Sequence, residues 1–258
     1  MMQVCVFWRN PMIRLLALRE LRSLFAMPST WFMLAILQFI FTWFFLNTLQ
    51  TFLDLQPQLA QLANAPGVTT IVAAPLFNML ALLLMMLVPM FTMRLIAEER
   101  RNQSIALLLS APLSIRHIVL GKFFGLLTFL VVMMAGVPLM LYTLALGTDL
   151  DHGLLLGNLL GLLLLTASYI SVGLYVSSLT AQPVIAAIGA LAVLAGLWLA
   201  DIAATAEDSP WHIISPLNHF QTFNAGLLDS GDVAFFVLFS AVFLLLTMRR
   251  INNNRIYG

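Results

Sequence analysis

The side chains that could support chemistry are few, and many of them lie in one segment, from Arg94 to Lys122. Within it, Gly121 and Lys122 have the form of the end of a phosphate-binding loop. That loop follows the pattern GxxxxGK[ST], which here would require Gly at Arg116 and Ser or Thr at Phe123. Because both positions differ, we expect this chain to have no nucleotide site of its own.

An intramembrane enzyme is a second chemistry to consider. The sequence contains no HExxH motif and no serine framed as GxSxG. The pair Glu98-Glu99 is similar to the EExxxR element of membrane-embedded CAAX-type proteases, but the position that needs Arg is Gln103. The four histidines, which we expect on both sides of a membrane, are His117, His152, His212 and His219. We therefore predict neither catalytic nor metal-binding residues, and an intramembrane enzyme remains an alternative.

The composition defines the surroundings of these residues. The 258 residues are 61% hydrophobic and 9% charged, whereas soluble domains contain about 25% charged residues. A formal net charge of +1 provides no excess field for nucleic acid, and the single cysteine, Cys5, excludes a disulfide scaffold. The composition is that of a multi-pass membrane protein.

Six apolar stretches predict an all-α fold with six transmembrane helices. A helix needs about 20 residues to cross the hydrocarbon core. The predicted spans are residues 31–53, 71–93, 123–146, 154–178, 184–200 and 233–248.

The distribution of charge predicts the orientation of these spans. With the N-terminus in the cytoplasm, all 12 basic residues fall in inner segments, and the outer segments contain acidic residues only. Cytoplasmic segments are enriched in Lys and Arg. We therefore expect both termini inside.

The segments before the first span and before the last span predict further helices. Residues 11–27 predict an amphipathic helix on the inner membrane surface, and residues 202–231, divided by Pro210 and Pro216, predict re-entrant helices on the outer side. Glycines recur every fourth residue, a spacing that favours close helix packing. These are Gly121 and Gly125, and Gly153, Gly157 and Gly161. The spacing leaves open whether they pack within one chain or between subunits.

The predicted cytoplasmic loop, residues 94–122, carries an apolar run, Ile105–Leu109, between charged residues. A solvated loop would not place Leu107 and Leu108 in water, so this run must dock onto another protein or surface.

This loop resembles that of the type-2 ABC transporter permeases, particularly the branch with the nitrous-oxide-reductase maturation (NosY-like) and gliding-motility (GldF-like) subunits. The residues that carry the resemblance are Glu98, Glu99, Arg100, Ser104, Leu107, Leu108, Ser110, Pro112, Gly121 and Lys122. Gln103 stands where Gly is usual in that branch, and Ala106 where an acidic residue is usual. A second similar patch precedes the last span and comprises Ser215, Pro216, His219, Phe220, Phe223, Gly226, Asp229 and Asp232.

The resemblance implies a type V exporter in the bacterial inner membrane. Two copies of a cytoplasmic ATPase subunit would bind ATP and Mg, and a second permease, identical or related, would complete the complex. It implies ATPase-coupling residues, which are Glu98, Glu99, Arg100, Arg101, Ser104, Ile105, Leu107, Leu108 and Pro112. It also implies an outer gate, formed by Pro210, Trp211, Pro216, His219, Phe220 and Phe223.

Two questions stay open at this point. The complex could export a substrate, or it could transmit motion across the membrane to a periplasmic partner. A proton-coupled carrier is a further alternative to an ATP-driven complex, although no predicted span carries a fully embedded charge. Membrane lipid is an expected partner of the chain, and nucleic acid is not.

Overall fold

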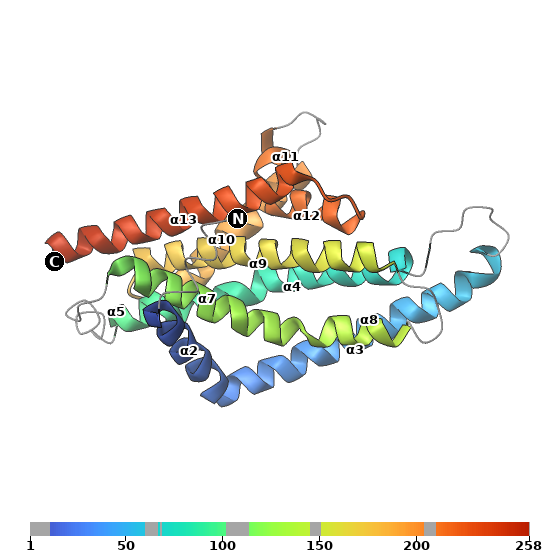
Figure 1. Ribbon diagram of the computed structural model, residues 1–258, viewed down its shortest axis with the longest axis horizontal. Coiled ribbons are helices and arrows are strands. Elements are labelled where there is room, and N and C mark those ends of the chain that lie inside the picture. Colours follow the sequence, from blue (N-terminus) through green and yellow to red (C-terminus); the bar gives the residue numbers. More distant parts are fainter. Residues whose placement is uncertain are drawn as a thin grey trace.

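The computed structural model describes residues 11–59, 67, 69–101, 114–144, 151–203 and 210–257. The elements in these ranges are all helical, which confirms the predicted all-α class. In chain order (Figure 1) they are α2 (Pro11–Ala26), α3 (Pro28–Leu59), the π-helical turn η1 (Thr69–Ala73), α4 (Ala74–Met93), the π-helical turn η2 (Arg94–Glu98), α5 (Glu99–Arg101), α7 (Ile115–Met134), α8 (Gly136–Leu144), α9 (His152–Leu179), α10 (Pro183–Ala203), α11 (Pro210–Ile214), α12 (Pro216–Asn224) and α13 (Ser230–Tyr257).

Six helical stretches in the described residues are long and apolar enough to cross a membrane, as predicted. They are Pro28–Gln58, Thr69–Arg101, Ile115–Leu144, His152–Leu179, Pro183–Ala203 and Ser230–Asn253. Most of these helical stretches are longer than the apolar runs in the sequence, because a helix continues through polar residues of good helix propensity, such as Glu and Arg. The second span thus continues through η2 and α5, and the third begins at Ile115, inside the segment predicted as a loop.

The third span consists of two helices, α7 and α8, that meet at Ala135. Pro138 has no N–H to bond the carbonyl group of Met134, four residues earlier. A Cβ atom on Gly136 would lie 1.7 Å from the side-chain nitrogen of Gln38 in α3, so a larger residue there would require this flexible side chain to move. The proline accounts for the break.

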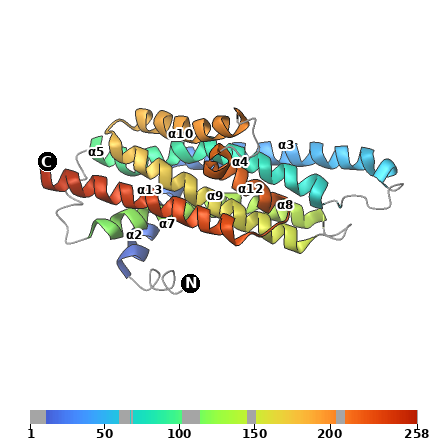
Figure 2. The same cartoon turned by 90° about the horizontal axis from the view of Figure 1, so that it is seen from above.

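Helix α9 is the centre of the bundle. It packs against α4, α7, α10, α12 and α13, and Figure 2 shows it running beside α13 and α4. In its most apolar stretch 61% of residues are buried, whereas the share is 17% in α3 and in α10. Helices α3 and α10 therefore lie at the periphery, where α3 exposes Phe32, Phe39 and Trp43.

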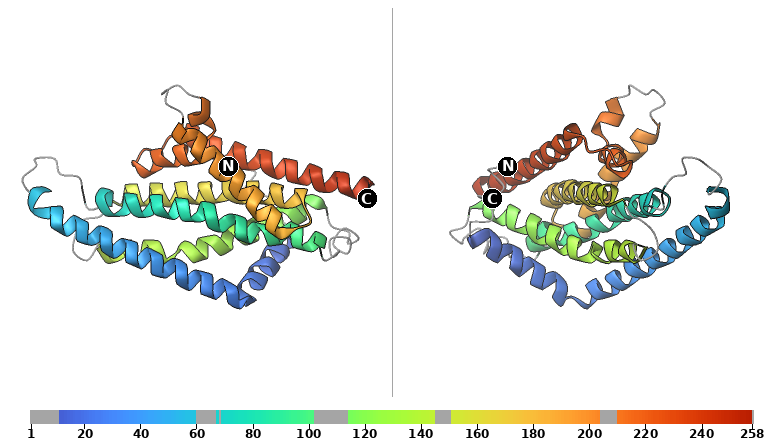
Figure 3. Two further views of the ribbon diagram at one scale, coloured as in Figure 1. Left: turned by 180° about the vertical axis from the view of Figure 1, so that it is seen from behind. Right: turned by 45° about the vertical axis from the view of Figure 1, so that its right-hand side comes forward.

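Successive spans run in opposite directions, so the charges separate toward two ends. Helix α2, α5, the start of α7 and the end of α13 lie at one end, while α11 and α12 lie near the other end of α13 (Figures 1 and 3). We call the first end the basic end, because the Lys and Arg residues whose side chains the structure describes lie there. They are Arg14, Arg19, Arg22, Arg94, Arg100, Arg101, Arg116, Lys122, Arg249 and Arg250.

Candidate functional site

Lys122, the only lysine of the chain, forms ion pairs with two glutamates from different elements. Its ammonium nitrogen lies 2.7 Å from Oε1 of Glu20 in α2 and 2.7 Å from Oε1 of Glu99 in α5. The lysine side chain is only 6% exposed. Its three hydrogens allow both charge-assisted bonds to form at once. These three residues, the Lys122 node, join α2, the end of the second span and the start of the third.

Two glycines bring α2 and α7 into contact beside the node. A Cβ atom on Gly121 would lie 2.6 Å from Cβ of Leu16, and one on Gly125 would lie 2.9 Å from Cβ of Glu20. Real Cβ atoms do not approach so closely, and larger residues would therefore separate the helices. This glycine pair packs within one chain, which is one of the two interpretations that its spacing left open.

A hydroxyl group of α9 reaches the same end of the second span. The N–H of Ala97 in η2 donates to Oγ of Ser177 over 3.0 Å, and this hydroxyl group donates to the carbonyl oxygen of Met93 over 3.3 Å. A π-helical turn leaves backbone groups without their usual α-helical partners, and Ser177 satisfies two of them. The central helix is thereby joined to the segment that leads into the node.

The predicted ATPase-coupling residues fall partly within this region. Glu98 and Arg101 are exposed, Arg100 is half-buried, and Glu99 belongs to the Lys122 node. The other predicted coupling residues, Ser104, Ile105, Leu107, Leu108 and Pro112, lie outside the described residues. In the chain, Glu99 precedes the undescribed segment 102–113 and Lys122 follows it.

Helices α11 and α12 bridge four spans away from the basic end, and we call them the outer cap after the side of the membrane that the sequence predicts for them. His219 of α12 pairs with Asp232 of α13, with 2.6 Å between Nδ1 and Oδ1. His212 of α11 pairs with Asp201 of α10 over 2.7 Å. The side-chain amide of Asn224 donates to the carbonyl oxygen of Ala74 in α4 over 3.1 Å. The fourth contact is with α9.

That fourth contact depends on Gly161 of α9. A Cβ atom there would lie 2.8 Å from Cβ of Phe223, whereas one on Gly157 would lie at an ordinary contact distance, 3.6 Å from Cδ2 of Leu228. The glycine face thus receives the outer cap of the same chain. Gly153 does not take part, since a Cβ there would meet only Asp151.

The surroundings of His219 give both ring nitrogens a hydrogen-bonding partner. Its Nε2 is 2.9 Å from the carbonyl oxygen of Ile213, which can only accept, so Nε2 donates to it. Nδ1 faces a carboxylate oxygen of Asp232. The other carboxylate oxygen is within hydrogen-bonding reach of the Thr222 hydroxyl group, and the His219 ring stacks on Phe235 at 3.9 Å. The Asp232 carboxylate thus contacts two side chains of α12, His219 and Thr222.

The predicted outer-gate residues come together only in part. Phe220 and Phe223 are fully buried, Pro216 is buried in the first turn of α12, and His219 makes the contacts described above. Pro210 begins α11, but its side chain and that of Trp211 lie outside what the structure describes. In this conformation the aromatic side chains fill the core between α12 and α9.

Sequence reasoning did not identify several of these contacts. Glu20 is 102 residues from Lys122, and nothing in the local pattern links them. The available signal was that position 122 is the single lysine among 12 basic residues. Asp201 and His212 were also missed as a pair. Their placement on the same predicted side of the membrane was the available signal. Across the described residues no three His, Cys, Asp or Glu side chains converge as a metal ion would require.

Comparison with known proteins adds one finding. The family model described as ABC-2 family transporter protein matches residues 15–253, which is nearly the whole chain. A search of curated proteins finds no match.

Proposed function

Because the chain belongs to the ABC-2 family of transporter proteins, and is thus a membrane subunit of an ABC transporter, we propose that a separate cytoplasmic ATPase drives it from the basic end. The Lys122 node is the observation that carries this proposal. It joins α2, α5 and α7, and the chain between α5 and α7 contains the apolar run Ile105–Leu109. The ATPase would bind this run and displace the node.

Two routes lead from the node into the bundle. One runs through the Glu20 ion pair to α2, and from there to α3, which begins two residues after α2 ends. The other runs through η2 and Ser177 to α9, whose glycine face carries the outer cap. Packed helices and ion pairs transmit a displacement as rigid elements. ATP binding would thereby tilt α3, α4 and α10 and open a pathway beneath the outer cap.

The proposal also covers the orientation of the chain in the membrane and its partner subunits. The basic end faces the cytoplasm of a bacterial cell, α2 lies on the inner membrane surface, and α11 and α12 are re-entrant from the outside. Two ATPase subunits hold ATP and Mg, and a second permease, identical or related, completes a dimer. The complex exports a substrate or transmits motion to a periplasmic partner.

Co-purification tests the ATPase contact. The tagged chain is expressed with its cognate ATPase and extracted in mild detergent, and the amount of ATPase retained on the chain is measured. We expect the double variant Leu107→Asp, Leu108→Asp to lose at least about nine-tenths of it, because two carboxylates in an apolar contact cost several kcal/mol.

The matched control carries the same change at the other end. Leu227 and Leu228 are each 65% exposed near the outer cap. The double variant Leu227→Asp, Leu228→Asp should retain the ATPase. Full retention by the Leu107, Leu108 variant would show that the ATPase binds elsewhere, and equal loss by both variants would show a general folding defect instead of a lost contact.

A further inference from the structure

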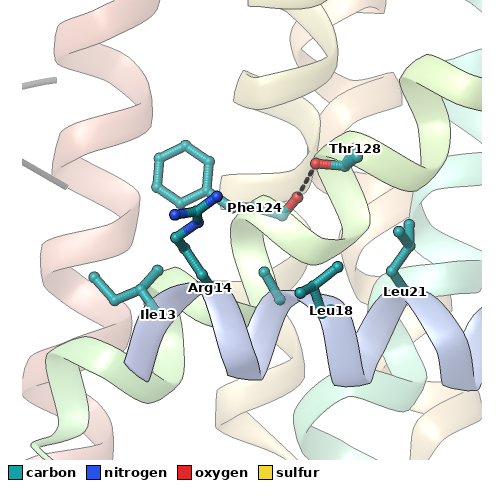
Figure 4. Close-up of a pocket in the computed structure, with 7 residues that line it drawn as sticks. Ile13, Arg14, Leu18, Leu21, Phe124 and Thr128 are labelled. Atoms are coloured by element: carbon teal, nitrogen blue, oxygen red, sulfur yellow. Dashed lines mark hydrogen bonds between the residues drawn. The ribbon is translucent and has the colours of Figure 1, made fainter. Parts of the chain in front are cut away.

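A cavity of about 150 Å³ lies between α2 and α7, at the basic end. Ile13, Leu18 and Leu21 line it from α2, and Phe124 and Thr128 line it from α7. Figure 4 shows these side chains around the space, with Arg14 beside it. The hydroxyl group of Thr128 donates to the carbonyl oxygen of Phe124 over 2.8 Å, so it presents no unused hydrogen to the cavity. The walls are apolar, with one cation among them.

Arg14 lies beside the apolar side chains that line the cavity. In Figure 4 the guanidinium group of Arg14 lies in front of the phenyl ring of Phe124. Arg14 is exposed, so a ligand can reach its planar guanidinium group, which binds phosphate oxygens in pairs. A ligand that satisfies both features has a phosphate group attached to an apolar chain.

An exposed apolar strip on α7 extends beyond the cavity. Phe124 and Thr128 are followed on the same helix face by Val131 and Val132, which are 38% and 49% exposed. This strip leads away from the basic end, along the direction of the third span. An acyl chain that enters the cavity can therefore follow α7 into the hydrocarbon region.

The positive charge of α2 favours an anionic ligand. Arg14, Arg19 and Arg22 are exposed, whereas Glu20, the only acidic residue of α2, is engaged by Lys122. Of these cations only Arg14 lines the cavity, and the attraction of one Arg near the surface for an anionic headgroup is about 1 kcal/mol. A zwitterionic lipid would gain little from it.

We infer that this cavity is a binding site for an anionic phospholipid of the leaflet that α2 contacts. Its phosphate group binds Arg14, and one acyl chain lies between Ile13, Leu21 and Phe124. Bound lipid holds α2 against α7 beside the Lys122 node. The inference requires α2 to lie at a membrane surface, but it does not depend on an ATPase.

Lipid titration of the full chain in detergent, followed by native mass spectrometry, tests the site. The probes are dioleoyl-phosphatidylglycerol, which is anionic, and dioleoyl-phosphatidylcholine, which is zwitterionic. We expect phosphatidylglycerol to bind at least about fivefold more tightly than phosphatidylcholine, and the variant Arg14→Gln to remove this preference. Thr128→Trp should weaken the binding of both lipids, because an indole ring at this exposed position occupies the cavity.

Arg19→Gln is the matched control. Arg19 is exposed on the same helix, about 140° around its axis from Arg14, and its loss should change the affinity for phosphatidylglycerol less than twofold. Equal losses in the two arginine variants would show general attraction to a basic surface and would overturn the site. Displacement of the lipid by excess inorganic phosphate would also overturn it, because the ligand would then be free phosphate.

Discussion

At the scale of single residues, the choice of lysine at position 122 has a physical reason. A compact ammonium group can contact two carboxylates that come from different helices, whereas the planar guanidinium group of arginine favours one carboxylate in a forked pair. The chain uses arginine at its other basic positions. Lysine stands where three elements meet and where little water is present to solvate a charge.

Replacing this lysine leaves two glutamates facing each other without a cation. Removal of one partner from a fully buried ion pair costs about 3–5 kcal/mol, and because Glu20 and Glu99 are partly exposed, we expect Lys122→Met to cost about 2–4 kcal/mol. The measurement is the midpoint of thermal unfolding of the purified chain in detergent. The control is Glu98→Gln, which removes an exposed carboxylate next to the node and should leave the midpoint unchanged. An unchanged midpoint for Lys122→Met would contradict the node.

The outer cap permits a second prediction at this scale. Asp232→Asn removes the carboxylate that binds His219 and lies near Thr222, which should destabilise the outer cap by roughly 1–3 kcal/mol. Hydrogen exchange of the α12 amides should become faster. Asp229→Asn is the control, because Asp229 is exposed and its side chain accepts only from the N–H of Gly231 among the contacts described for it. Equal protection of α12 in both variants would show that the Asp232 contact does not hold the cap.

At the scale of elements, glycines decide which helices approach each other. Gly121 and Gly125 place α2 on α7, and Gly161 places the outer cap on α9. In a bilayer no hydrophobic force drives one helix onto another, so close van der Waals contact has to provide the association energy. These glycines therefore bring together the helices that form the Lys122 node and those that hold the His–Asp pairs of the outer cap.

A single methyl group tests this packing. In Gly121→Ala the new Cβ would lie 2.6 Å from Cβ of Leu16, which moves only with the backbone, so we expect a loss of roughly 1–3 kcal/mol. Gly196→Ala in α10 is the control, because a Cβ there meets nothing within 4 Å. Thermal unfolding should show a lower midpoint for the first variant and an unchanged or higher one for the second. Equal midpoints would contradict the close contact of α2 with α7.

The predictable part of the fold is the part that depends on local composition. Six apolar runs predicted six membrane-spanning helices, because five runs are long enough alone and the short sixth, residues 233–248, is bounded by charged residues at both ends. Their ends were not predictable from hydropathy, since residues such as Arg94 and Glu99 continue the helix of the second span. The Glu20–Lys122 contact depends on how α2 and α7 are rotated about their axes, which no local pattern specifies. The two His–Asp pairs of the outer cap were missed for the same reason.

At the scale of the whole molecule, the bundle separates two kinds of site. The basic end holds the Lys122 node beside the segment 102–113, and the outer cap holds its two His–Asp pairs near the start of α13. Helix α9 connects the two, through Ser177 at one end and Gly161 toward the other. A displacement at the basic end therefore has a continuous packed path to the outer cap.

The rate of ATP hydrolysis tests the central claim most directly. The cognate ATPase is measured alone, with the chain in nanodiscs, and with the Lys122→Met variant in nanodiscs, each with and without vanadate. We predict that the chain raises the vanadate-sensitive rate severalfold, and that Lys122→Met still binds the ATPase but loses this increase. Identical rates with and without the chain would contradict the account.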